Sequence, residues 1–93
     1  MVSRKVVVRN ETGLHLRPAG VLCNLAEQFQ SSIRFQTGGG ASGGNAKSVL
    51  SVLGACIRHG DELEFICEGA DEAEALKAVV DAVEQGLGEE LSH

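Results

Sequence analysis

A histidine and an arginine that could carry out phosphoryl chemistry lie two residues apart near the N-terminus. His15 and Arg17 occur in the run Gly13-Leu14-His15-Leu16-Arg17-Pro18-Ala19. A neutral imidazole nitrogen is nucleophilic near pH 7, and a guanidinium donates paired hydrogen bonds to phosphate oxygens. The pair is therefore a candidate phosphoryl acceptor. The alternative is a half-exposed turn histidine beside a solvated arginine, and this spacing alone favours neither.

The residues after His15 predict a helix that positions it. Apolar side chains recur at three- and four-residue spacing and share one helix face: Ala19, Leu22, Leu25, Ala26 and Phe29. Pro18 is tolerated only in the first turn, because it lacks an N–H and clashes with a preceding turn. We expect a helix from about Leu16 to Gln28, with His15 at its N-cap. There the ring faces unpaired backbone N–H groups, which favour a neutral imidazole and bind anions.

Alternating and β-branched residues predict four strands. Val2–Val8 is rich in valine, and 33–37 and 63–67 alternate apolar with polar residues. Between them, residues 37–44 contain five glycines in eight positions. We interpret this segment as a hairpin, with Ala41-Ser42 as a short return strand. It lacks the sequence order of a nucleotide-binding loop.

Two further helices follow from capping and periodicity. Ser48 is a favoured N-cap before the short amphipathic run 49–53. Asp71 is predicted to cap a long helix, with Glu74 as its capping-box partner and an end at Gly86 or Gly88. The expected buried stripe is Ala73, Leu76, Val80, Val83 and Leu87. The element order β-α-β-β-α-β-α predicts an α+β fold with an antiparallel sheet covered on one face by helices.

Composition limits the class of protein. Residues 1–93 are expected to form one domain with an aliphatic core, because Trp and Tyr are absent and Phe occurs three times. A net charge of −5 without a basic stripe argues against nucleic-acid binding. We expect no membrane span, no metal site and no cofactor. Cys23, Cys56 and Cys67 lack a CxxC spacing and are expected to be reduced, buried thiols of a cytoplasmic monomer.

The run Gly13–Ala19 resembles the phosphorylation-site signature of the HPr family, the histidine phosphocarriers of the phosphoenolpyruvate-dependent sugar phosphotransferase system. The run Asn45-Ala46-Lys47-Ser48-Val49-Leu50-Ser51-Val52-Leu53 resembles the family's second signature, around a regulatory serine. The order and spacing of the two signatures fit the family over nearly the whole chain. The resemblance implies an open-faced β-sandwich, with four antiparallel strands and three helices on one face.

The resemblance also implies a function and a set of site residues. Enzyme I would phosphorylate His15, at Nδ1, and enzyme IIA proteins would take the group on, so that the chain is a co-substrate and not an enzyme. Leu16 and Arg17 would stabilise the phosphate. The implied partner interface is Leu16, Gly20, Val49, Leu50 and Leu53. Ser48 would be the regulatory phosphoserine, with HPr kinase/phosphorylase and a catabolite-control transcription regulator as further partners, although capping alone also accounts for it.

The sequence departs from the family pattern on the surface that meets partners. Leu16 replaces a smaller alanine, and Gly20 lacks a side chain. Asn24 and Glu27 stand where many sugar-system members carry lysines. These departures keep open a nitrogen-type paralog, which would carry phosphate on the same histidine but act by binding regulators. A binding module that never carries phosphate is the other alternative. The organism, the sugars, the use of Ser48 and the role of loop 38–44 cannot be read from the chain.

Overall fold

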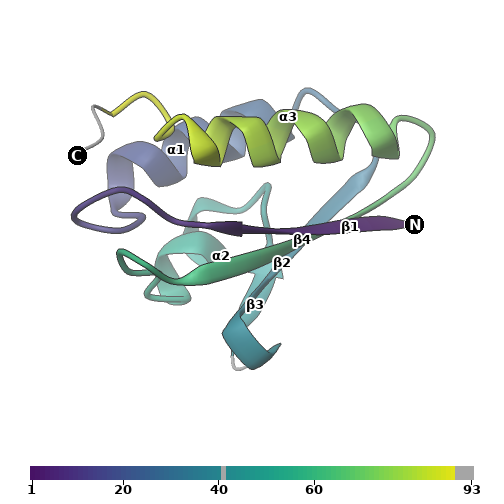
Figure 1. Ribbon diagram of the computed structural model, residues 1–93. Coiled ribbons are helices and arrows are strands. Elements are labelled where there is room, and N and C mark those ends of the chain that lie inside the picture. The colour runs from purple at the N-terminus through teal and green to yellow at the C-terminus, as the bar shows by residue number, and fades with distance from the viewer. Residues whose placement is uncertain (41, 90–93) are drawn as a thin grey trace.

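The structure is a computed structural model that describes residues 1–40 and 42–89. Its elements follow the predicted order, with one additional 3-10 turn at Gly38–Gly40 (Figure 1). The strands are β1 (Val2–Val7), β2 (Ser32–Thr37), β3 (Gly43–Asn45) and β4 (Glu62–Glu68). The helices are α1 (Leu16–Ala26), α2 (Val49–Gly54) and α3 (Glu72–Glu84).

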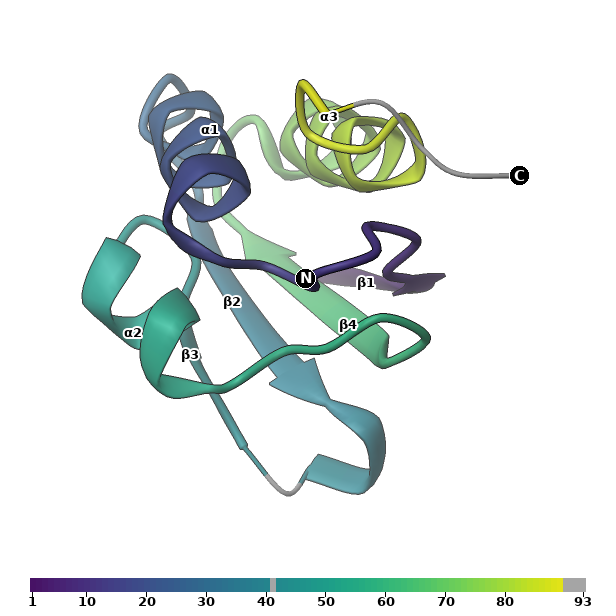
Figure 2. The same cartoon turned by 90° about the vertical axis from the view of Figure 1, so that its left-hand side faces the viewer.

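The four strands form one antiparallel sheet in the order β1-β4-β2-β3. The alternation predicted for β4 is confirmed, because Leu63, Phe65 and Cys67 are fully buried. Phe65 lies opposite Phe35 of β2 on the inner face. Helices α1 and α3 lie over this face, and α2 lies beside β3, where it packs against α1 (Figure 2). The expected α+β fold with an antiparallel sheet and three helices is confirmed.

A mostly aliphatic core holds the helices on the sheet. The largest fully buried side chains include two phenylalanines and four other large residues: Phe35, Phe65, Leu22, Ile33, Leu63 and Leu87. Five valines are also fully buried, one just after β1, one in α2 and three in α3: Val8, Val52, Val79, Val80 and Val83. Of α1, the side chains of Pro18, Ala19, Leu22, Cys23 and Ala26 are buried. Burial of this stripe against the sheet fixes where α1 starts, and therefore where His15 lies.

Several predicted boundaries are shifted by one to two residues. Helix α1 ends at Ala26 and not at Gln28, because the chain tightens to i−3 bonds, from Gln28 N to Leu25 O and from Phe29 N to Ala26 O. Strand β1 ends one residue early, at Val7. The return strand is Gly43–Asn45 and not Ala41-Ser42; of that pair, residue 41 lies outside the described residues.

The predicted buried stripe of α3 is partly wrong. Ala75 and Val79 are buried together with Val80, Val83 and Leu87, whereas Ala73 is exposed and Leu76 is half-buried. The helix therefore presents a face rotated from the expected one. Alanine and valine occur around much of this helix, so its sequence is compatible with burial of either the predicted or the observed face. Contact with β1 and β4 determines which face is buried.

Asp71 is the N-cap of α3 as predicted, but the predicted capping box is wrong. The carboxylate of Asp71 makes no capping bond and accepts instead from the backbone N–H groups of Gln30 and Ser31 and from the Ser31 hydroxyl. Glu72 accepts from the N–H of Gly69 at 3.2 Å. Asp71 thus joins the start of α3 to the turn after α1, a tertiary contact that local capping preferences do not contain.

The cysteines divide into two classes. Cys23 and Cys67 are buried as expected, and burial raises the pKa of both thiols. Cys56 is exposed, with a φ of 52°, so the expectation of a buried thiol is wrong there. It lies in the turn after α2, between the half-buried Ala55 and the buried Ile57. Within 1–40 and 42–89, every helix is too short or too polar to cross a membrane.

The Asp71 contact generates a prediction about pH. The hydrogen bond from the Ser31 hydroxyl, helped by the backbone N–H groups, lowers the pKa of Asp71. A lowered folded-state pKa adds stability above the ordinary aspartate value of about 4, and this stability is lost as the pH falls through the folded value. We expect Asp71→Asn to lower the urea midpoint at pH 7, by an amount that shrinks below about pH 4.

Asp81→Asn is the matched control, because it removes the same charge from α3 but breaks only an exposed ion pair with Lys77. Equal urea midpoints for the two variants at pH 7 would contradict the assignment. So would a deficit of Asp71→Asn that stays constant down to pH 3.

Candidate functional site

His15 lies at the N-cap of α1, as the sequence predicts. Its backbone is extended, with φ −79° and ψ −170°, and its carbonyl accepts the first helical bond from Ala19 N at 3.0 Å. The side chain is exposed and makes no capping hydrogen bond. Helix geometry leaves the N–H groups of Leu16 and Arg17 without an acceptor four residues earlier, and Pro18 has none to satisfy. The ring therefore stands at an exposed helix start whose first two backbone donors bond to none of residues 1–40 and 42–89.

The loop before His15 is held against the segment after α2. Leu14 N donates to Ile57 O at 3.0 Å, and Gly13 N donates to Asn10 O at 3.0 Å. Gly13 is buried and has a φ of 69°; a Cβ placed there would lie 2.2 Å from Ile57 O. Only glycine fits this close approach in this conformation. The contact fixes the chain two residues before the histidine.

The ring of His15 has a carboxylate partner that the sequence analysis missed. Nε2 of His15 lies 2.9 Å from Oε2 of Glu89, 74 positions away. The other oxygen, Oε1, accepts from the side-chain amide of Asn10 at 2.7 Å. The hydrogen bond from Asn10 is the main reason that the pKa of Glu89 is lowered; the His15 ring and Arg17 lower it further, and partial burial opposes them. Glu89 is therefore ionised near neutral pH.

A sharp turn after α3 brings Glu89 to the helix start. Gly86, Leu87 and Gly88 all have left-handed backbone, with φ values of 89°, 52° and 84°. Leu87 is buried in the core, and its N–H donates to Ala82 O. Asn10 also donates to Gly86 O at 2.9 Å. The end of α3 and the loop after β1 thus lie at the same end of the molecule (Figure 1). The glycines in the sequence indicate a turn here, but they do not indicate that the turn brings Glu89 to His15.

A shallow hollow adjoins the His15–Glu89 pair. It is lined by Glu11, Thr12, Arg17, Gly88 and Glu89. Arg17 and the Thr12 hydroxyl can donate to an anion, whereas the two carboxylates limit how much negative charge the hollow holds. An open site of this kind can hold a phosphoryl group without enclosing it.

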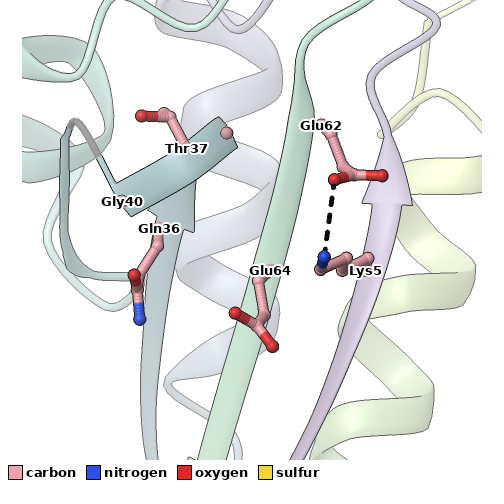
Figure 3. A pocket seen from close by; sticks show the side chains of 7 residues that line it. Lys5, Gln36, Thr37, Gly40, Glu62 and Glu64 are labelled. Atoms are coloured by element: carbon pink, nitrogen blue, oxygen red, sulfur yellow. Dashed lines mark ion pairs between the residues drawn. The ribbon is translucent and has the colours of Figure 1, made fainter.

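A second hollow, on the open face of the sheet, has no comparable chemistry. Lys5, Gln36, Thr37, Gly38, Gly40, Glu62 and Glu64 line it, and Lys5 Nζ lies 3.9 Å from Glu62 Oε1 (Figure 3). The lining contains no histidine or cysteine, and two carboxylates face its one lysine. In the described ranges 1–40 and 42–89, no three His, Cys, Asp or Glu side chains are grouped as metal ligands would be.

The implied partner interface is only partly exposed. Leu16 and Leu50 are exposed at 67% and 81%. Val49 and Leu53 are half-buried against the core. At Gly20 a Cβ would meet nothing within 4 Å. Val21, which the sequence analysis did not name, is also exposed. Since α1 and α2 pack against each other, Leu16 and Leu50 belong to neighbouring helices (Figure 2).

Ser48 caps α2 as predicted. Its hydroxyl oxygen accepts from Ser51 N at 3.2 Å. The preceding Lys47 donates from Nζ to Phe29 O at 2.8 Å, which ties the start of α2 to the end of α1. Of the other histidines, His59 is exposed in the turn before β4, and the residue at position 93 lies outside the described residues.

Comparison with known proteins identifies the family. A family model described as the PTS HPr component phosphorylation site matches residues 2–85. The chain belongs to the HPr family. The resemblance drawn from its two signatures is therefore confirmed. His15 and Arg17 lie within the matched residues, whereas Glu89 follows them.

Relatives of this HPr domain occur alone and within longer proteins. It is 41% identical to the multiphosphoryl transfer protein of Escherichia coli O157:H7 over 96% of this chain, but spans only 24% of that protein. It is 35% identical to the phosphocarrier protein HPr of Mycoplasma genitalium, over 87% of this chain and 91% of that protein. The chain thus spans about a quarter of some relatives and nearly all of others.

Solved HPr structures share the fold. HPr-C-His from Thermoanaerobacter tengcongensis superposes with a TM-score of 0.90 at 36% identity, covering 98% of this chain and 100% of that one. A phosphocarrier protein HPr from Bacillus anthracis gives 0.81 at 32% identity, covering 88% and 95%.

The Gly13 contact generates a matched pair of predictions. Gly13→Ala forces an alanine into left-handed backbone and its Cβ against Ile57 O, which should lower the free energy of unfolding by about 1–3 kcal/mol. Gly20→Ala is the same change in the open middle of α1 and should raise it by about 0.5–1 kcal/mol. Urea unfolding of both variants measures the two effects. Equal free energies of unfolding for the two variants would contradict the conclusion that the close contact of Gly13 with Ile57 O fixes the chain before His15.

Proposed function

We propose that His15 accepts a phosphoryl group from phosphorylated enzyme I and passes it to an enzyme IIA protein of sugar transport. The observation that carries the proposal is an exposed imidazole at the start of α1 beside Arg17, in a chain of the HPr family. When a ring nitrogen of His15 attacks, its lone pair forms the N–P bond. The donor's N–P bond breaks, and that electron pair returns to the donor. The domain serves as a co-substrate whose partners supply the catalytic groups.

The environment of His15 suits a carrier. The free N–H groups of Leu16 and Arg17 and the Arg17 guanidinium can hold the dianion from one side. Exposure of the ring leaves the other side open to a partner, so that the group is held but can be taken away. The exposed side chains of Leu16 and Leu50 offer an apolar contact for transient docking. The proposed relay takes place in the cytoplasm.

Residues at the rim of this surface favour a second candidate, a nitrogen-type regulatory carrier. Asn24 on α1 and Glu27 at its C-cap are exposed, at positions where many sugar-system members are expected to carry lysines. A rim charge chiefly alters association rate and partner choice. Relative rates of phosphoryl transfer from sugar-type and nitrogen-type enzyme I would distinguish the two branches.

The proposal predicts the result of phosphotransfer from labelled phosphoenolpyruvate and enzyme I. Wild type should carry acid-labile label that mass spectrometry at neutral pH maps to His15, and His15→Ala should carry none. Arg17→Ala should slow transfer about 10- to 100-fold, because it removes one charge-assisted hydrogen bond worth about 1.5–3 kcal/mol, while the domain stays folded. His59→Ala, an exposed loop variant, is the control and should transfer normally. Full labelling of His15→Ala would refute the proposal.

Regulation at Ser48 is a separate proposal. It is supported by the resemblance of residues 45–53 to the family's second signature and by the position of Ser48 near the exposed Leu50. HPr kinase/phosphorylase with ATP should place acid-stable phosphate on Ser48, adding nearly two negative charges to the docking face, to which a catabolite-control regulator would respond. Ser48→Ala should abolish this label. Ser51→Ala, one turn on in α2, should keep it, because its backbone N–H and the Ser48 cap remain. Label retained by Ser48→Ala would contradict the assignment.

A further inference from the structure

We propose that Glu89, oriented by Asn10, is a positioning residue that holds the His15 ring as the Nε2–H tautomer and stabilises the ring's positive charge while it carries phosphate. The role of Glu89 in phosphoryl transfer rests on the proposed phosphocarrier function. The selection of one His15 tautomer by Glu89 concerns the unphosphorylated protein and does not depend on that function.

The contact between Glu89 and His15 selects one tautomer. An ionised carboxylate oxygen only accepts hydrogen bonds, so Oε2 at 2.9 Å from Nε2 requires a proton on Nε2. The other neutral tautomer would set a lone pair of Nε2 against a lone pair of Oε2. With the proton on Nε2, Nδ1 carries the free lone pair. Glu89 thereby directs the nucleophile to one side of the ring.

Asn10 fixes the carboxylate in turn. Its amide nitrogen donates both to Glu89 Oε1 and to Gly86 O, at 2.7 and 2.9 Å. A flipped amide would point an oxygen at two acceptors, so the amide has one orientation. In that orientation Asn10 Oδ1 is buried, and it accepts no hydrogen bond from residues 1–40 and 42–89. The two donated bonds therefore hold the Glu89 carboxylate in one position beside the ring.

The second part of the role appears when the phosphoryl group arrives. The lone pair on Nδ1 forms the N–P bond, the donor's N–P bond breaks toward the donor, and Nε2 keeps its proton. The ring is then an imidazolium, whose charge Glu89 offsets at contact distance. Onward transfer breaks the new N–P bond and returns the electron pair to Nδ1. The leaving group is then a neutral imidazole, which the retained Nε2 proton makes favourable.

Among the charged groups near the His15 ring, Glu89 is the one placed for this role. Arg17 and Glu11 line the adjoining hollow, but the carboxylate in hydrogen-bond contact with the ring, within 1–40 and 42–89, is that of Glu89. A glutamine cannot replace it. The two donors, from Asn10 and His15, each need an acceptor, and an amide would turn its NH2 group toward one of them.

The test is ¹⁵N NMR of histidine-labelled, unphosphorylated protein at about pH 8, where exposed neutral rings predominate. Wild type should show His15 as the Nε2–H tautomer, with an observable Hε2 resonance protected from exchange by Glu89. The exposed His59 in the same sample should show a mixture without that resonance. Glu89→Ala and Glu89→Gln should make His15 resemble His59. Glu84→Ala, an exposed acid on α3, should leave His15 unchanged.

Transfer kinetics complete the test. Glu89→Ala should accept phosphate from enzyme I about tenfold more slowly or worse, since it loses a hydrogen bond to a charged group. An Hε2 resonance that persists in Glu89→Ala, or an unchanged transfer rate in a variant that has lost it, would overturn the role of Glu89. Failure of wild type to accept phosphate would instead refute the phosphocarrier proposal and leave the tautomer result standing.

Discussion

The first turn of α1 is the constraint on which the site depends. A helix cannot satisfy its own first N–H groups, and at this start the capping side chain is an imidazole that makes no capping bond. The donors of Leu16 and Arg17 therefore remain available to an external anion. Pro18 and Ala19, one step further, are buried in the core, so the start of the helix cannot slide along the sequence. Exposure of the ring and rigidity of its backbone come from the same turn.

The fold brings distant parts of the chain to this turn. Strand β4 lies between β1 and β2, so the last strand of the chain pairs with the first. The loop after β1 then meets the turn after α3, and Asn10 joins them through Gly86 and Glu89. Leu87 anchors that turn in the core. Packing of the domain is therefore coupled to the position of the carboxylate that contacts His15.

The local parts of this account could be predicted from the sequence, and the tertiary parts could not. Pro18 and the apolar spacing after it located the N-cap at His15, because both act within one or two turns of helix. Ser48 likewise capped the helix that it was expected to cap. Asp71 lies at the predicted N-cap of α3, but its carboxylate makes no capping bond, because two backbone donors and a hydroxyl from another part of the chain bind it instead. Glu89 was not among the site residues predicted from the sequence. Its partner is 74 residues away, and no spacing rule connects them. The face that α3 buries was ambiguous, since small apolar residues surround much of the helix.

The central claim is that the free nitrogen of one exposed imidazole carries the phosphoryl group while the opposite nitrogen stays protonated. A direct measurement is the ³¹P–¹⁵N coupling in histidine-labelled protein that enzyme I and phosphoenolpyruvate have phosphorylated. The account predicts a one-bond coupling from phosphorus to Nδ1 of His15, with a proton on Nε2. Coupling to Nε2, or phosphorus attached to any other residue, would contradict it.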